Sequence, residues 1–341
     1  MIMTDFGKHL EKFFIKYLVG EYGASKHTIR AYRDSFGMLL AFMKEAKSIN
    51  ADTLQLKHLN RDVILDFLLW LETRHKNNIS TRNQRYAAIR SFCKYLQYEE
   101  PTRISEWQNI RSIRLKRGIT KTINYLSIDA IKLLLEQIST NNHNSSRDLA
   151  MIALLYDSGA RVQELIDLSP SCLRLEKPYT IRLLGKGNKE RFVILQEEQV
   201  QLLKQYILDY GLNRREKEMG PLFFNRIGEK LTTAGVTYIL KKYANQARLI
   251  NKEIIPSVIS PHILRHSKAM HLLQAGIDLI TIRDFLGHSS IQTTEIYARA
   301  DSKQKREALE AVYVDVLPQN SYNGRSWENN SYLKEFLKGL G

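Results

Sequence analysis

The chain has little cysteine and no long apolar segment, and both absences narrow the kind of protein it can be. Only Cys93 and Cys172 occur in 341 residues, which excludes a disulfide framework and fits a reducing cytoplasm. No apolar run approaches the ~18 residues that a membrane-spanning helix needs. The N-terminal segment MIMTDFGKHLEKFF carries charges and lacks the apolar core of a signal peptide. The sequence therefore predicts a cytoplasmic protein without a membrane segment.

Acidic residues are few in comparison with basic ones. The chain has 51 Lys and Arg against 36 Asp and Glu, a net charge of +15 and a pI of about 9.6. Such a balance indicates a polyanionic partner, either nucleic acid or an anionic membrane surface. Nucleic acid is favoured, ahead of a basic protein with no anionic partner. The length suggests about two domains.

The first 100 residues carry apolar side chains at helical spacing and show no strand alternation. Two helices are predicted near the start, and Ser25 fits the N-cap of the second. Two more follow in DVILDFLLWLETR and in TRNQRYAAIRSFCKYLQY, the last capped near Ser80. Residues 1–100 are therefore predicted to form an all-helical domain.

Pro101 interrupts this pattern, and a basic stretch follows. No acidic residue lies between Trp107 and Lys121. Such a like-charge run is typical of a solvated linker, and between two domains of a basic protein it can also lie along a DNA backbone. We predict a basic inter-domain linker over residues 101–126.

A second domain is predicted over residues 127–317, mostly helical with one β element. The runs PYTIRLL and RFVIL suit short strands, and GKGNKE between them suits a hairpin turn that contains Lys186. Residues 318–341 are predicted to form a polar tail with a short amphipathic helix. The predicted fold class is thus mainly α with a small antiparallel β-sheet.

Six polar residues of the second domain together suit chemistry on a phosphodiester. They are Arg161, Lys186, His262, Arg265, His288 and Tyr297. Guanidinium groups give phosphate oxygens paired hydrogen bonds and stay charged at any working pH. Histidines can donate to a phosphate oxygen or relay a proton, and a turn lysine can protonate a leaving oxygen. A tyrosine among these cations, which favour its phenolate, can act as the nucleophile.

A metal site is the competing interpretation of the histidines. His262 and His266 stand four apart on one predicted helix, and His271 is close. No H-E-x-x-H pattern occurs, and cationic surroundings disfavour a divalent ion. We therefore expect neither a metal nor another cofactor.

These residues resemble the motifs of the tyrosine recombinase family, which includes phage integrases and Xer-like resolvases. ARVQEL resembles the first arginine box, with Glu164 as its supporting acid, and LGKGNKERFV resembles the lysine hairpin. HILRHSKAMHLL resembles the H-x-x-R box, and LGHSSIQTTEIYARA resembles the box that ends in the tyrosine. The four boxes occur in family order, and the resemblance covers nearly the whole chain.

The resemblance implies a C-shaped DNA clamp, with an N-terminal core-binding domain on one face of the duplex and a mixed α/β catalytic domain on the other. Basic faces of the second and fourth N-terminal helices would meet the major groove, and the linker would follow the backbone. The DNA-contact candidates are Lys26, His27, Arg30, Arg33, Arg82, Asn83, Arg85, Arg90, Arg111, Arg114, Lys116 and Arg117.

The resemblance also implies a mechanism and an assembly. Tyr297 would form a 3′-phosphotyrosyl bond without ATP or metal, with His262 assisting its proton transfer and Lys186 protonating the 5′-oxygen. Family members act as tetramers at inverted-repeat sites, in some cases with accessory DNA-bending proteins. A C-terminal segment would dock on a neighbour. Its candidates are Leu309, Val312, Tyr313 and Val316, or else Tyr332, Leu333, Phe336 and Leu337.

Other functions remain open at this point. A type IB topoisomerase-like enzyme would share the phosphotyrosine step, a DNA-binding protein without catalysis would form no adduct, and a membrane-surface protein would show no preference for DNA. Among recombinases, a mobile-element integrase or transposase is preferred to a resolvase of replicon dimers, because the tail past Tyr297 is longer than strand cleavage requires.

Overall fold

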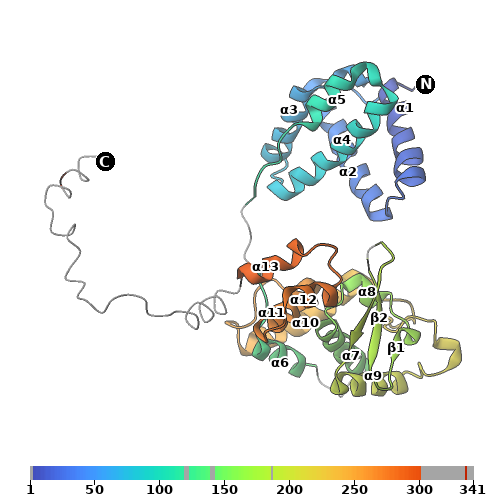
Figure 1. Cartoon of the computed structure of the whole chain (residues 1–341), viewed down its shortest axis with the longest axis vertical. Helices are drawn as coiled ribbons and strands as arrows, with labels where there is room; N and C mark the ends of the chain where they lie inside the picture. The colour runs from blue at the N-terminus through green and yellow to red at the C-terminus, as the bar shows by residue number, and fades with distance from the viewer. Residues whose placement is uncertain (1–2, 119–122, 139–142, 186, 301–334, 336–341) are drawn as a thin grey trace. The chain divides into compact units, whose positions relative to one another are not determined.

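The computed structural model describes residues 3–118, 123–138, 143–185, 187–300 and 335 (Figure 1). The chain divides into two compact units, residues 1–121 and 122–341. The described part is mainly helical with one small antiparallel sheet, so the predicted fold class is confirmed. Among these described residues, no helix is both long and apolar enough to cross a membrane. Lys186 and both candidate docking segments lie outside the described residues.

The N-terminal unit is built from helices whose apolar faces meet in one core. Ser25 accepts a hydrogen bond from the Thr28 amide and caps α2, as predicted. The cap of α4 is Asn78, two residues before Ser80 and so near the predicted position, and its side chain accepts a hydrogen bond from the Thr81 amide at 2.8 Å. The elements are α1 (Asp5–Lys12), the π-helical η1 (Phe13–Glu21), α2 (Lys26–Lys47), η2 (Leu56–His58), α3 (Arg61–Thr73), α4 (Ile79–Glu99), η3 (Pro101–Arg103) and α5 (Ile104–Arg111).

Helix α5 occupies the start of the predicted linker but belongs to the N-terminal core. Trp107, Ile110 and Ile113 are buried, and the Tyr86 hydroxyl donates to the carbonyl oxygens of Ile110 and Ile113 at 2.6 and 3.1 Å. These apolar residues recur at helical spacing inside a basic run. The basic residues led to the prediction of a linker where the structure has a packed helix. The N-terminal unit thus extends past residue 100. Within the predicted linker, the first exposed basic residue is Arg114.

The second unit combines helices with one three-stranded sheet of order β1-β2-β3, antiparallel throughout. Leu184 pairs with Glu190, which places the predicted hairpin turn between β2 and β3. Ile181, Leu183 and Val193 point into the core. The elements are α6 (Ile128–Glu136), α7 (His143–Asp157), α8 (Val162–Ile166), η4 (Pro170–Cys172), β1 (Leu173–Arg174), β2 (Thr180–Leu184), β3 (Glu190–Ile194), α9 (Glu197–Asp209), η5 (Arg215–Lys217), α10 (Thr233–Ile250), α11 (Pro261–Gln274), α12 (Leu279–Leu286) and α13 (Gln292–Ala300).

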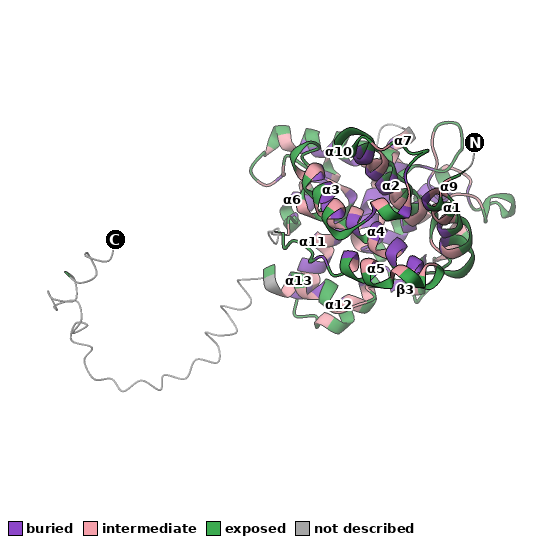
Figure 2. Ribbon diagram, turned by 90° about the horizontal axis from the view of Figure 1, so that it is seen from above, coloured by how far each residue is buried: buried purple, intermediate pink, exposed green. Residues whose placement is uncertain are grey.

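Helices α11, α12 and α13 share a separate apolar cluster that positions the C-terminal part of this unit. Met270 of α11, Ile282 and Leu286 of α12, and Tyr297 of α13 are buried against one another. The three helices contact each other pairwise, and their buried residues can be followed in Figure 2. The position of Tyr297 is therefore set by packing as well as by polar contacts.

Replacing Trp107 by alanine tests whether α5 is part of the N-terminal core. The free energy of unfolding of that unit should fall by about 3–5 kcal/mol, because a fully buried indole leaves a cavity. Urea unfolding of the full chain, followed by hydrogen exchange in residues 3–118, measures the change. Ile104→Ala on the same helix is the control, since Ile104 is 43% exposed. Equal, small effects of the two substitutions would contradict the assignment.

Candidate active site

The five predicted catalytic residues that the structure describes lie on or beside α8, α11, α12 and α13 of the second unit (Figure 1). Helix α8 contacts β2, α12 contacts β3, and α11, α12 and α13 contact one another. Arg161 precedes α8 at its N-cap position, Arg265 and His262 lie on α11, His288 follows α12, and Tyr297 lies on α13. Residues up to 136 positions apart in the sequence thus meet at one place.

Glu164 is the anionic centre of this site. Its carboxylate is buried and accepts hydrogen bonds from the Arg161 amide at 2.8 Å and the Arg161 guanidinium at 2.7 Å. Arg191 of β3 donates to the same carboxylate through two nitrogens, at 3.1 and 2.7 Å. Burial alone would raise the pKa of Glu164, but the hydrogen bonds from Arg191 and Arg161 together lower it. The carboxylate is therefore ionised and fixes both guanidinium groups.

Arg265 is fixed by backbone carbonyl groups instead of by an acid. Its two terminal nitrogens donate to the carbonyl oxygens of Gly159 and Leu286, each at 2.6 Å. Gly159 has a φ of 57°, and a Cβ there would lie 3.0 Å from the side chains of Phe285 and Leu286. Burial, then the charge of Arg161, lowers the pKa of Arg265 to about 9, so its guanidinium remains charged at neutral pH.

Tyr297 is 1% exposed, and its hydroxyl contacts a histidine that the sequence analysis did not select for catalysis. The hydroxyl oxygen lies 2.9 Å from Nδ1 of His266. The predicted partner His262 is one helical turn away on α11 and exposed, with its ring 5.9 Å from that of His266. Burial raises the pKa of Tyr297 more than the charges of Arg265 and Arg161 lower it. The predicted preference for phenolate is therefore reversed in this structure.

His288 lies against the other side of the tyrosine ring. The two rings are nearly parallel, at an angle of 9° and a centroid separation of 6.4 Å. Nδ1 of His288 lies 2.9 Å from the hydroxyl of Thr294, which fixes the imidazole. Burial and the charges of Arg265 and Arg161 lower the pKa of His288 to about 4, so it is neutral at pH 7.

The hairpin that carries Lys186 is anchored beside Glu164, although Lys186 itself is not described. The Gly185 amide donates to the Lys189 carbonyl oxygen at 2.8 Å. A Cβ on Gly185 would lie 3.4 Å from a carboxylate oxygen of Glu164. Gly187 and Asn188 adopt positive φ, as a tight turn requires.

Several DNA-contact candidates form one basic surface across α2 and α4. Lys26, His27, Arg30 and Arg33 are exposed on α2. The hydrogen bond from Arg33, followed by the positive charges of Arg33, Arg30 and Arg85, lowers the pKa of Asp34. Arg85 donates to the Asp34 carbonyl oxygen at 3.3 Å. Arg30, Arg33 and Arg85 therefore lie around Asp34.

Other candidates have intramolecular partners. Arg82 was predicted to be a surface residue that contacts DNA. The structure instead buries it, with Nε 3.1 Å from Oε1 of Glu72. The Asn83 amide donates to the Lys116 carbonyl oxygen at 2.8 Å, and Lys116 pairs with Glu72.

The remaining four candidates are half-buried or exposed. Arg90 lies over the Tyr86 ring, and Arg111 donates to Gln97 at 2.5 Å. Arg114 and Arg117 are exposed.

Three site residues were missed from the sequence, namely Arg191, His266 and Thr294. Arg191 lies two residues before buried Val193 on β3 and therefore on the same inward face, so an arginine at an inward-facing strand position was the available signal. His266 directly follows Arg265 and was considered only as a metal ligand. The described residues contain no group of His, Cys, Asp and Glu that could hold a metal ion.

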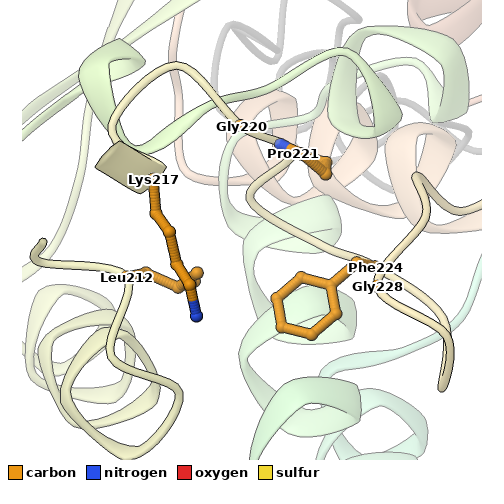
Figure 3. A pocket seen from close by; sticks show the side chains of 6 residues that line it. All are labelled: Leu212, Lys217, Gly220, Pro221, Phe224 and Gly228. Atoms are coloured by element: carbon orange, nitrogen blue, oxygen red, sulfur yellow. The ribbon is translucent and has the colours of Figure 1, made fainter. Parts of the chain in front are cut away.

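An apolar cavity elsewhere in the unit is separate from this site. It has a volume of about 170 Å³ and is lined by Leu212, Lys217, Gly220, Pro221, Phe224 and Gly228 (Figure 3). None of the six predicted catalytic residues lines it, and the Lys217 ammonium group donates to the Tyr210 carbonyl oxygen at 3.2 Å.

Comparisons with known proteins identify the family to which the chain belongs. The model of the phage integrase family matches residues 124–304, and that of the phage integrase N-terminal SAM-like domain matches residues 12–100. The tyrosine recombinase XerC of Herpetosiphon aurantiacus is 35% identical over 291 residues, covering 85% of this chain and 90% of that one. The tyrosine recombinase XerD of Listeria innocua is 32% identical over 310 residues, covering 90% and 97%.

Solved structures give the same result. The XerH site-specific recombinase, bound to a palindromic difH substrate in a post-cleavage complex, is 25% identical with a TM-score of 0.67. The match covers 87% of this chain and 83% of that chain.

Substituting Arg191 by methionine tests whether the Glu164 carboxylate depends on it. The second unit should lose on the order of 3 kcal/mol of stability, because a buried carboxylate loses one of its two guanidinium partners. Arg182→Met is the matched control, since Arg182 pairs with Glu190 on the exposed side of the same sheet and should change stability by less than about 1 kcal/mol. Urea unfolding measures both, and equal effects would refute the role given to Arg191.

Proposed function

This chain belongs to the phage integrase family and is a tyrosine site-specific recombinase, and we propose that Tyr297 is the nucleophile with which it cleaves and rejoins DNA. The observation that carries the proposal is the convergence of Arg161, Arg265 and His288 on the buried hydroxyl-bearing ring of Tyr297. Arg161, Arg265 and His288 lie on different segments of the chain, and the fold brings them together.

The two arginines are proposed to bind the scissile phosphate. A phosphodiester under in-line attack gains negative charge on its non-bridging oxygens, and two fixed guanidinium groups compensate that charge. Arg161 is held by Glu164 and Arg265 by two carbonyl oxygens, so neither has to be ordered when DNA arrives. His288 and the exposed His262 are proposed to donate to the same phosphate.

Strand cleavage then proceeds by nucleophilic displacement. The Tyr297 oxygen bonds to phosphorus, the bond to the 5′-oxygen breaks, and Lys186 is proposed to protonate that leaving oxygen. The product is a 3′-phosphotyrosyl bond with a free 5′-hydroxyl. Attack by a 5′-hydroxyl of a partner duplex reverses the step, so the phosphodiester bond energy is conserved and neither ATP nor a metal is required.

DNA is the substrate, and the basic α2–α4 surface of the N-terminal unit is proposed to bind it. Arg30, Arg33 and Arg85 gather there, and Arg114 and Arg117 supply exposed charge in the segment that follows α5. A homotetramer on paired inverted-repeat sites, aided in some settings by DNA-bending proteins, is proposed as the recombining assembly. Its location is proposed to be the cytoplasm.

The biological role has two candidates. The XerC and XerD relatives favour Xer-like resolution of replicon dimers. Integration or excision of a mobile element uses the same residues and the same chemistry. The sequence of the target site distinguishes the two roles. A resolvase acts on a site in the replicon itself, whereas an integrase acts at the ends of a mobile element.

Replacing Tyr297 by phenylalanine removes the proposed nucleophilic oxygen. Covalent protein–DNA adducts on randomly nicked genomic DNA should fall on the order of 10³-fold or more, while DNA affinity stays within about twofold. Detergent denaturation, recovery of protein-linked DNA and sequencing measure the adducts and locate the target. Tyr206→Phe is the control, because Tyr206 is an equally buried tyrosine that donates to Leu222 away from the site. Adducts that persist in Tyr297→Phe would refute the assignment.

A further inference from the structure

Among the described residues, the Tyr297 hydroxyl has one polar partner, and it is a residue outside the six family positions. The Tyr297 hydroxyl is buried, and Nδ1 of His266 lies 2.9 Å from it. No other polar contact of this hydroxyl occurs among the described residues. A buried hydroxyl donates its proton to an acceptor, so the phenol donates to Nδ1 and the imidazole carries its own proton on Nε2.

The surroundings keep His266 neutral and thus able to accept. Burial, then the charges of His262 and Arg265, lowers the pKa of His266 to about 4. The groups that face it are His262 and Arg265 on its own helix and Tyr297 on α13, with Arg161 and His288 farther across the site. A phosphodiester bound by the arginines would add negative charge beside these groups and raise the pKa of His266 toward the range of an effective base.

We propose that His266 is a further catalytic residue, which takes the proton of Tyr297 as the phenol oxygen attacks phosphorus. This inference rests on the proposed function of Tyr297. The proton moves from the phenol oxygen to Nδ1, the oxygen–phosphorus bond forms, and the phosphorus–5′-oxygen bond breaks. The leaving oxygen receives a different proton, from Lys186. In the rejoining step, His266 returns its proton to the tyrosine oxygen.

The position of His266 explains why it, and not His262, serves the nucleophile. Both lie on the same face of α11, four residues apart, but only His266 reaches the hydroxyl. His262 is the exposed member of the pair and is left to contact the phosphate. The packing of α13 on α11 through Tyr297 and Met270 fixes the distance between the base and the nucleophile.

The test compares adduct formation by the wild-type chain and by His266→Asn on a nicked substrate containing the target recovered above. The asparagine oxygen can accept the phenol hydrogen bond but cannot take up a proton at neutral pH. The rate of adduct formation should fall ~10²–10⁴-fold, with DNA affinity within about twofold. His271→Asn is the matched control, because its Nδ1 contacts the Tyr156 hydroxyl at 2.8 Å on the same helix, away from Tyr297.

A second substrate, with sulfur in place of the bridging 5′-oxygen, separates the two proton transfers. A thiolate leaves without protonation. Adduct formation by Lys186→Ala should therefore be faster on this substrate than on the normal one, whereas adduct formation by His266→Asn should stay slow. A His266→Asn rate within threefold of wild type would overturn the inference, and so would recovery of that variant on the sulfur substrate.

His266→Gln is the second variant if the His266→Asn chain does not fold. A wild-type chain that forms no adduct at Tyr297 would instead refute the proposed function.

Discussion

The buried carboxylate of Glu164 organises most of the site. Three segments meet at it, namely the start of α8 through Arg161, strand β3 through Arg191, and the hairpin base through Gly185. Arg191 also donates from Nε to the Phe285 carbonyl oxygen, which connects the same carboxylate to the end of α12. An ionised group can remain buried only when it is fully paired, so this one acid both requires and fixes the basic residues around it.

The proposed nucleophile is held by different forces. Tyr297 packs in the apolar cluster of α11, α12 and α13, and its polar end meets His266. The site thus consists of an ionic part, which is suited to binding phosphate, and a separately packed helix that carries the oxygen proposed to attack. Burial keeps that oxygen protonated, since it raises the pKa of Tyr297 despite two arginines nearby. The proposed base, His266, contacts the hydroxyl and would remove its proton when the oxygen attacks.

Periodic patterns in the sequence predicted the elements, but not all of their partners. The N-cap Ser25 and the hairpin between β2 and β3 followed from local rules, because caps and turns depend on neighbouring residues. Helix α5 was not predicted, because basic residues surround its apolar positions. The burial of Arg82 was not predicted either, because its partner Glu72 lies on another helix. Arg191 and His266 were missed because their contacts join residues 27 and 31 positions apart, which no local pattern reports.

The central claim is that Tyr297 becomes covalently joined to the 3′-phosphate of a cleaved strand. Mass spectrometry of the trypsin-digested adduct tests it directly, because cleavage after Arg283 and Arg299 releases residues 284–299, which contain one tyrosine. We expect a nucleotide 3′-phosphate on Tyr297 in that peptide, with a free 5′-hydroxyl on the released DNA. A nucleotide on another residue, or a linkage through the 5′-phosphate, would contradict it.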